Sequence, residues 1–213
     1  MKKFFFTAFV ALSMTAMAQH VTPLSIEIAD VKLDSLRTLY LAEPPMYRAS
    51  LNVVEQALDK NAEEIKAAKA ELKVEQAHAK EMGNSLKGAN KMVAALKKLY
   101  AKEEGELKSM QKVVEKQQKT LSKQKGLNKE TSTNYSTLLE KQQKELSYSL
   151  RDVADRQRAI ADLEQTLQNG QTSLQAYVHE TEQKATELAQ KEALLKERQA
   201  QLKAEQKTAK TMQ

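Results

Sequence analysis

The chain contains no cysteine and no tryptophan, and only 3 of its 213 residues are proline and 5 are glycine. Without cysteine it can form no disulfide, no thiolate metal site and no lipid-modified cysteine. All four phenylalanines lie within the first nine residues, so six tyrosines are the only aromatic residues in the rest of the chain. A globular domain of this size normally fills its core with bulky aromatic side chains. The composition therefore argues against a large globular core.

The first eighteen residues have the pattern of a secretory signal peptide. Lys2 and Lys3 precede an uncharged apolar run over residues 4–15, and the tripeptide Ala-Met-Ala ends at Ala18. Ala16 and Ala18 place small residues at the −3 and −1 positions of a signal peptidase site, which predicts cleavage between Ala18 and Gln19. A membrane anchor is the alternative, but the run is shorter than the roughly 20 residues that a span needs. We predict a signal peptide over residues 1–18 and an exported chain, most simply periplasmic in a Gram-negative cell, with no transmembrane segment after cleavage.

The chain also has only a small excess of one sign of charge. The formal net charge is +6, and removal of Lys2 and Lys3 lowers it to +4, with acidic and basic residues interspersed. This pattern is typical of the solvated face of a helix and predicts no nucleic-acid partner. Beyond residue 18, the abundant residues are Ala, Leu, Glu, Lys and Gln, which are strong helix formers and typical of long helices and coiled coils.

A seven-residue apolar period runs through two long stretches. Every seventh residue from Leu51 to Leu121 is apolar or aromatic, and so is every seventh from Leu139 to Ala209 except Thr181. Positions three residues further on are mixed in character. One strong and one weak column predict coiled-coil arms over residues 46–125 and 135–212. The predicted seam consists of Leu51, Leu58, Ile65, Leu72, Leu86, Val93, Leu107, Val114, Leu121, Leu139, Leu146, Val153, Ile160, Leu167, Leu174, Leu188, Leu195 and Leu202.

The period breaks at residues 125–134, KGLNKETSTN. Gly126 suits the left-handed conformation that often follows a helix, and the Asn, Thr and Ser residues after it favour turns and helix N-caps. If the second helix starts late, Thr137 and Glu140 have capping-box spacing. The stretches from Arg48 to Lys125 and from Tyr135 to Met212 have equal length, 78 residues each. These features predict a turn at residues 126–134 that pairs positions whose numbers sum to about 260; the alternative is one continuous rod.

Residues 19–45 form a separate N-terminal segment. Leu24, Ile26 and Ile28 alternate as in a strand, whereas helical spacing is also present, and the sequence does not decide between strand and helix for residues 24–33. Asp34 is a plausible N-cap of a short helix that ends before residue 43, and Pro44-Pro45 breaks it. The predicted fold is all-α: a long antiparallel helical hairpin with a short N-terminal segment that caps its open end or pairs with a partner.

Candidate chemical sites are few. His78 and His179 fall at similar heights in the hairpin, and with Glu75 or Glu182 they could hold a metal; the alternative is that both histidines are solvated polar residues. No catalytic nucleophile, phosphate-binding loop or metal-ligand motif appears. We therefore predict no catalytic, cofactor-binding or metal-binding residues. Three glycines also fall at one height, which suggests a softer joint or, alternatively, tolerated surface glycine: Gly83, Gly88 and Gly170.

The export signal followed by a basic, Lys/Gln-rich helical hairpin resembles the periplasmic Skp/OmpH chaperones, in which helical arms project from a trimeric β-body and enclose unfolded outer-membrane proteins. The arms also resemble the coiled-coil hairpins of periplasmic scaffold proteins, such as the regulatory regions of division-associated hydrolase activators and the arms of efflux adaptors. More generally, the chain looks like the uncharacterised secreted coiled-coil proteins of Gram-negative envelopes.

These observations predict a non-enzymatic protein with a structural or scaffolding role. The mixed companion positions leave part of each apolar stripe uncovered, which favours a protein partner or a second copy, as a homodimer or higher oligomer. The resemblance implies a second function, that of a holdase chaperone for unfolded outer-membrane proteins. An enzyme would require a partner that supplies the chemistry.

Overall fold

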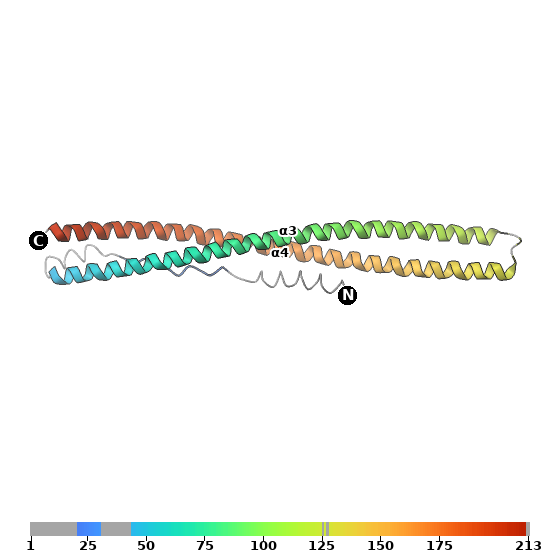
Figure 1. Ribbon diagram of the computed structural model, residues 1–213, viewed down its shortest axis with the longest axis horizontal. Helices are drawn as coiled ribbons and strands as arrows, with labels where there is room; N and C mark the ends of the chain where they lie inside the picture. Colours follow the sequence, from blue (N-terminus) through green and yellow to red (C-terminus); the bar gives the residue numbers. More distant parts are fainter. Residues whose placement is uncertain (1–20, 31–43, 125, 127, 212–213) are drawn as a thin grey trace. The chain divides into compact units, whose positions relative to one another are not determined.

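The computed structural model describes residues 21–30, 44–124, 126 and 128–211, and it is dominated by two long helices. Helix α3 spans Pro44–Lys123 and helix α4 spans Lys129–Thr211. The two helices are joined by a turn and pack against each other in opposite directions (Figure 1). Within the described ranges there is no strand. The predicted all-α helical hairpin is confirmed, and the continuous rod is ruled out.

Helix α3 begins two residues before the predicted start of the first arm. Pro44 and Pro45 both lie in its first turn, where proline is tolerated because the missing N–H has no partner within the helix anyway. The helix ends at Lys123, two residues before the predicted end. Lys123 lies in the last turn, where the negative end of the helix dipole favours a cation.

The turn between the helices is shorter than the sequence predicted. Gly126 has a φ angle of 113°, a conformation that favours glycine. Asn128 then caps α4, because its side-chain Oδ1 accepts a hydrogen bond from the backbone N–H of Glu130 at 3.3 Å. Its backbone oxygen accepts from the N–H of Ser132 at 3.0 Å. The predicted turn over residues 126–134 was therefore too long, since Asn128 already supplies the cap and α4 starts at Lys129 rather than residue 135.

The polar residues after Asn128 are accommodated inside the helix. The Thr133 hydroxyl donates to the backbone oxygen of Lys129 at 2.9 Å, and that of Thr137 donates to the oxygen of Thr133 at 3.0 Å. Such back-bonding satisfies a hydroxyl without interrupting a helix. The alternative capping box at Thr137 and Glu140 is therefore wrong.

The hairpin divides into two compact units. Among the described residues, the turn unit comprises 84–124, 126 and 128–172, and the open-end unit comprises 21–30, 44–83 and 173–211. Ion pairs report the helix register inside each unit: Lys69 Nζ lies 2.6 Å from Glu192 in the open-end unit, and Lys97 Nζ lies 2.9 Å from Glu164 in the turn unit. The residue numbers of both pairs sum to about 260, the predicted register.

Most predicted seam residues are buried. Leu107, Leu121, Leu146 and Leu174 are half-buried, and three of these four belong to the turn unit. The most deeply buried seam side chains include Leu58 and Leu188 in the open-end unit and Val93 and Val153 in the turn unit. The buried seam residues are Leu51, Leu58, Ile65, Leu72, Leu86, Val93, Val114, Leu139, Val153, Ile160, Leu167, Leu188, Leu195 and Leu202.

Residues 21–30 form neither helix nor strand. Both alternatives considered for this part of the N-terminal segment are therefore wrong over residues 24–30, and the hydrogen bonds described below give the reason. The signal peptide over residues 1–18, its cleavage site at Ala18 and Gln19, and the short helix starting at Asp34 lie outside the described residues.

Candidate protein-binding groove

The weak column of the coiled coil organises the surface of the hairpin. We call the positions three residues after each seam residue the companion columns. On α3 the described companion positions run in sevens through residues 54, 61, 68, 75 and so on to 117. On α4 they run from 142 to 205. In an antiparallel pair these columns line the groove between the helices, beside the seam.

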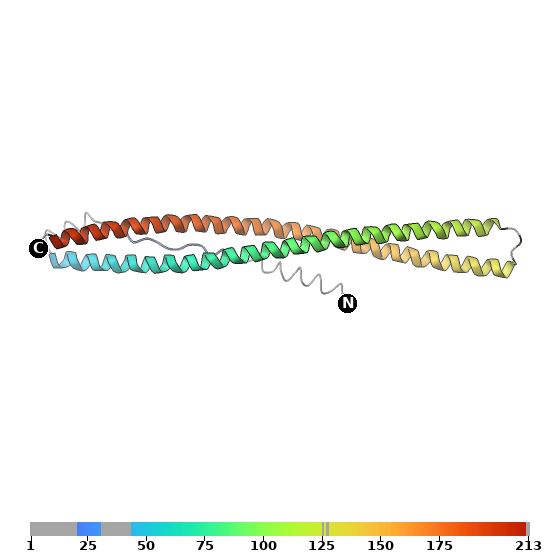
Figure 2. The same cartoon turned by 45° about the horizontal axis from the view of Figure 1, so that its top comes forward.

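In the open-end unit, residues 21–30 lie over the line between α3 and α4 (Figure 2). The Asn61 side chain holds their backbone: its Nδ2 donates to the oxygen of Glu27 at 3.0 Å, and its Oδ1 accepts from the N–H of Ala29 at 3.0 Å. Asn61 is a companion position and is only 6% exposed. Backbone groups that would pair within a helix or a strand are therefore satisfied by a side chain of α3.

Two further companion side chains bind residues 21–30. From α4, the Lys191 ammonium donates to the backbone oxygen of Ile26, and the Arg198 guanidinium pairs with Asp30 at 3.3 Å. Ile26 is buried, and Leu24 and Ile28 pack partly buried against the same core cluster. Alternate side chains thus face the helices, as in an extended chain.

A buried ion pair lies at the start of this segment. Lys184 Nζ donates to both carboxylate oxygens of Glu75, at 2.9 and 3.1 Å, and the backbone N–H of Thr22 donates to Glu75 Oε1 at 3.3 Å. The side chains of Lys184 and Glu75 are 5% and 14% exposed. Burial and, after it, the Glu75 carboxylate raise the pKa of the nearby Tyr177. Glu75 and Lys184, which are both companion residues, therefore neutralise each other's charge across the two helices.

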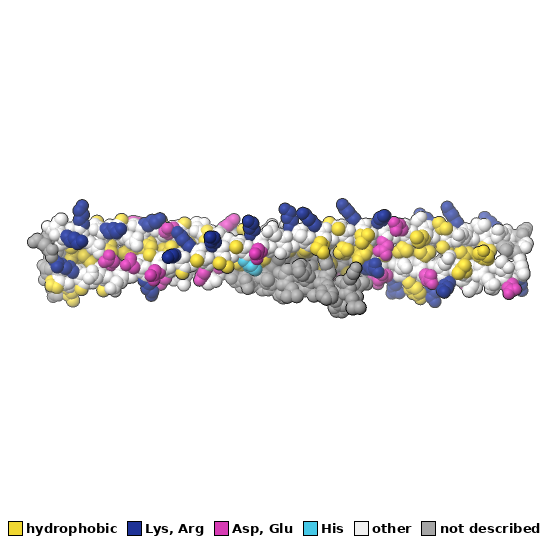
Figure 3. Space-filling model, viewed as in Figure 1, with side chains coloured by type: hydrophobic (Ala, Val, Ile, Leu, Met, Phe, Trp, Pro, Cys, Tyr) yellow, Lys and Arg dark blue, Asp and Glu magenta, His cyan; other side chains and the backbone are white. Residues whose placement is uncertain are grey.

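In the turn unit the companion columns border an open groove. Two adjoining hollows of about 680 and 660 Å³ lie between α3 and α4 and share three lining residues. Figure 3 shows hydrophobic side chains gathered along the line between the helices in this unit. We call the two hollows together the turn groove. It is lined by Glu106, Ser109, Met110, Val113, Val114, Lys116, Gln117, Thr120, Leu121, Gln124, Tyr135, Leu138, Leu139, Gln142, Glu145, Leu146 and Ser149.

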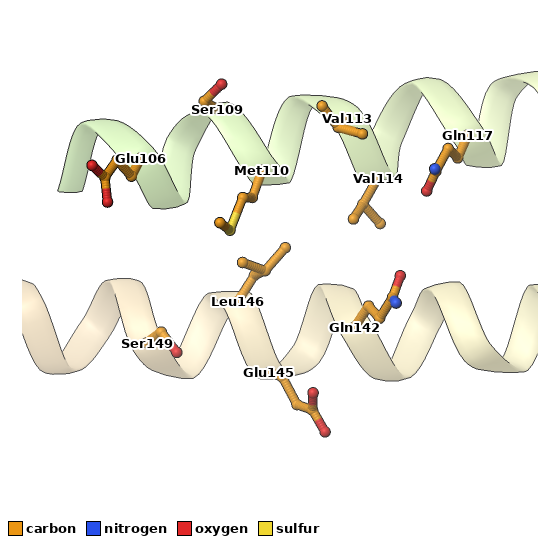
Figure 4. Close-up of a pocket in the computed structure, with 10 residues that line it drawn as sticks. All are labelled: Glu106, Ser109, Met110, Val113, Val114, Gln117, Gln142, Glu145, Leu146 and Ser149. Carbon is orange, nitrogen blue, oxygen red and sulfur yellow. The ribbon is translucent and has the colours of Figure 1, made fainter. Parts of the chain in front are cut away.

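The floor of the turn groove is apolar, and two side-chain amides lie across it. Met110 and Val114 of α3 point toward Leu146 of α4, and Gln117 and Gln142 face each other from opposite helices (Figure 4). Exposed apolar side chains border the groove: Met110 is 56% exposed, Val113 51%, Tyr135 55% and Leu138 51%. Such a patch with a polar rim is typical of an interaction surface.

Further from the turn than the groove, polar contacts link the two helices of the turn unit. The Arg156 guanidinium lies 5.6 Å from the centre of the Tyr100 ring and 3.7 Å from Glu103. Close by, the pKa of Glu104 is lowered by hydrogen bonds from Gln157 first and Lys108 second. Arg156 is itself a companion residue, and its guanidinium lies over the ring of Tyr100, which belongs to the seven-residue apolar period of α3.

The histidines predicted as metal-ligand candidates have other neighbours. The His78 and Tyr177 rings meet edge to face with centres 6.2 Å apart, and His179 Nε2 lies 2.9 Å from the Gln183 amide. Across the described residues, no three histidine or acidic side chains group closely enough to hold a metal ion. The structure therefore adds no support to a metal site.

The glycine joint remains a prediction. The division between the two units falls between Gly83 and Asn84 and between Thr172 and Ser173. A Cβ at Gly83 would meet Leu174 Cδ2 at 3.5 Å, an ordinary contact, and a Cβ at Gly88 would meet nothing within 4 Å. Packing therefore does not require glycine at either position.

Sequence reasoning recognised the weak companion columns but missed what covers them. The sequence pattern contained the indication. Asn61 and Glu75 interrupt a companion column beside an apolar seam, and a polar side chain in such a position needs a hydrogen-bond partner. In the described part of the chain, neither helix has a stretch with the length and apolar character of a membrane span. Comparisons with protein-family models, with curated proteins and with solved structures found no match for this chain.

Proposed function

We propose that this chain is a non-enzymatic, exported protein with a structural or scaffolding role in the cell envelope, which it performs by binding a protein partner or a second copy. The turn groove carries this proposal. It combines an apolar floor, four apolar side chains that are more than half exposed, and a rim of amides and charges. Binding surfaces have this composition.

The proposal that the chain has no enzymatic activity is based on its sequence. A chain without cysteine, with three histidines and with few glycines offers no obvious nucleophile, base and oxyanion site held together. The envelope location rests on the signal peptide pattern of residues 1–18.

Photo-crosslinking in the producing cells tests the proposed function. A photoreactive amino acid at Leu138, in the groove, should yield a discrete crosslinked species, either a homodimer or an adduct of defined mass. The matched control carries the same group at Lys141, which is exposed on α4 and is not a groove residue. Equal yields at both positions, or no adduct at Leu138, would contradict the proposal.

A holdase chaperone is the second candidate, and one specific observation favours it. The open-end unit binds an extended segment largely through that segment's backbone, by way of Asn61, Lys191 and Glu75. Backbone recognition tolerates many sequences. A holdase should suppress aggregation of an unfolded outer-membrane protein at stoichiometric amounts, and failure to do so would exclude this function.

A further inference from the structure

The open-end unit and the turn unit are built from the same companion columns, but among the described residues only the open-end unit has an extended segment, residues 21–30, bound over them. Counted in sevens from Asn61, the α3 companion column reaches Gln117 in the turn groove. Counted in sevens from Lys191, the α4 column reaches Gln142. Gln117 and Gln142 therefore occupy the positions whose counterparts bind the backbone of residues 21–30.

The amides of Gln117 and Gln142 resemble Asn61 in chemistry as well as in position. A side-chain amide donates to a carbonyl and accepts from an N–H, which is how Asn61 binds Glu27 and Ala29. Among the described residues neither Gln117 nor Gln142 has a hydrogen-bond partner. The adjacent glutamines Gln118 and Gln143, by contrast, bond to each other at 3.0 Å.

From this match, and on the basis of the function proposed above, we propose that the turn groove binds an extended segment of another polypeptide with apolar residues at alternate positions. Gln117 and Gln142 bind its backbone amides. Its alternate apolar side chains pack on Met110, Val114 and Leu146, as Leu24, Ile26 and Ile28 pack on the open-end unit. Backbone bonds supply affinity, and alternate pockets supply the preference for apolar residues.

The geometry favours an extended occupant over a helix of a second copy. The backbone groups in the middle of a helix are already paired internally, so a helix seated here would leave the two glutamine amides facing its side chains. An extended segment has free backbone groups on its edge. The groove runs from Glu106 to Gln124 along α3, which is about 27 Å, and this length accommodates roughly eight extended residues.

Fluorescence anisotropy with a defined peptide tests the proposal. The probe is a labelled synthetic peptide with the sequence of residues 21–30, VTPLSIEIAD, titrated with the exported chain. We expect saturable binding that falls roughly tenfold to a hundredfold in the double variant Gln117→Ala/Gln142→Ala, since each lost backbone bond contributes about a factor of three to ten. Both side chains are exposed, so the variant should fold normally.

The matched control is Gln118→Ala/Gln143→Ala, which removes two neighbouring amides that bond to each other. It should leave peptide affinity within about twofold. A second probe carries N-methyl groups on the alternate backbone nitrogens of the same peptide and should bind at least tenfold more weakly, because each methyl group removes a donor. Equal loss in the two double variants would overturn the proposal.

The remaining outcomes separate this inference from the proposed function. If light scattering gives twice the monomer mass, and Leu138→Lys returns the mass to that of a monomer, a second copy fills the groove; the extended-segment inference then fails while the scaffolding function stands. If the peptide does not bind but crosslinking at Leu138 persists, the inference alone fails. If both the peptide and the crosslink are absent, the inference and the proposed function fail together.

Discussion

The two units share one heptad pattern and differ in what covers it. In the open-end unit, residues 21–30 lie over the companion columns, and their backbone is bonded by Asn61, Lys191 and Glu75. In the turn unit the same columns border an open groove, and three of its seam leucines are only half-buried. Two helices with a mixed second column therefore do not bury their own apolar stripes, and a third segment completes the packing where one is present.

The difference also appears in the cross-helix ion pairs. Lys184 and Glu75 pair in the open-end unit with side chains 5% and 14% exposed, whereas Lys97 and Glu164 pair in the turn unit with side chains 63% and 42% exposed. An exposed pair contributes little to stability because water and salt screen it. A buried pair specifies register, because a slip would leave a charge without its partner.

The largest predicted effect is the loss of the buried pair. Lys184→Ala should lower the free energy of unfolding by about 3–5 kcal/mol, because it leaves the Glu75 carboxylate buried with the Thr22 amide but without its cation. Lys97→Ala in the turn unit should cost less than about 1 kcal/mol. Urea denaturation followed by circular dichroism measures both.

The double variant Lys184→Met/Glu75→Leu provides a control for that prediction. It replaces both charges with apolar groups, and most of the lost stability should return. If Lys184→Ala and Lys97→Ala have equal effects, the two units do not differ in the way that their burial indicates.

Truncation of seam leucines should separate the units next. Leu58 is 1% exposed in the open-end unit, whereas Leu107 is half-buried in the turn unit. Leu58→Ala should cost about 3 kcal/mol, because it leaves a cavity in packed surroundings, and Leu107→Ala about 1 kcal/mol, because water already reaches the site. Thermal unfolding of the two variants measures the difference. Similar losses would show that the turn-unit seam is packed as tightly as the other.

A smaller loss of stability is expected when residues 21–30 are released from the helices. Asn61→Ala removes the side chain that binds Glu27 and Ala29, and it should destabilise the chain by about 2 kcal/mol. Hydrogen exchange at residues 24–29 should accelerate, while exchange in the turn unit should not change. Asn52→Ala, at an exposed position of the same helix, is the control. Acceleration in both variants would mean that Asn61 does not hold the segment.

Sequence reasoning reached the hairpin, its register and the seam because these depend on local patterns. Seven-residue periodicity requires no knowledge of distant contacts, and Gly126 marks the turn by its own backbone preference. The start of α4 was misplaced because Thr131 to Asn134 are turn residues by propensity, whereas the cap at Asn128 was enough to begin the helix. Propensity is a weak guide where capping decides.

Residues 21–30 could not be placed from sequence for a different reason. Their conformation is set by side chains far away along the chain, with Asn61 and Lys191 supplying the bonds that a strand or helix partner would otherwise supply. The same limit applied to the turn groove. The weak companion columns indicated that part of the apolar stripe was uncovered, but only the fold showed that residues 21–30 lie over the open-end unit.

The smallest predicted effect concerns one glutamate in each unit. The pKa of Glu192 is lowered by hydrogen bonds from Lys69 and then Lys196, whereas that of Glu104 is lowered first by the neutral Gln157 amide and then by Lys108. A lowered folded-state pKa means that each contribution to stability is present above the ordinary glutamate pKa and is lost as the pH falls through the lowered value. Because Glu192 depends on two cations, added salt should raise its pKa more than that of Glu104. Carboxyl carbon NMR titrations at low and high salt measure both, with Glu192→Gln and Glu104→Gln to assign the signals. An equal salt response would mean that the charged partners of Glu192 contribute no more than the amide of Gln157 does at Glu104.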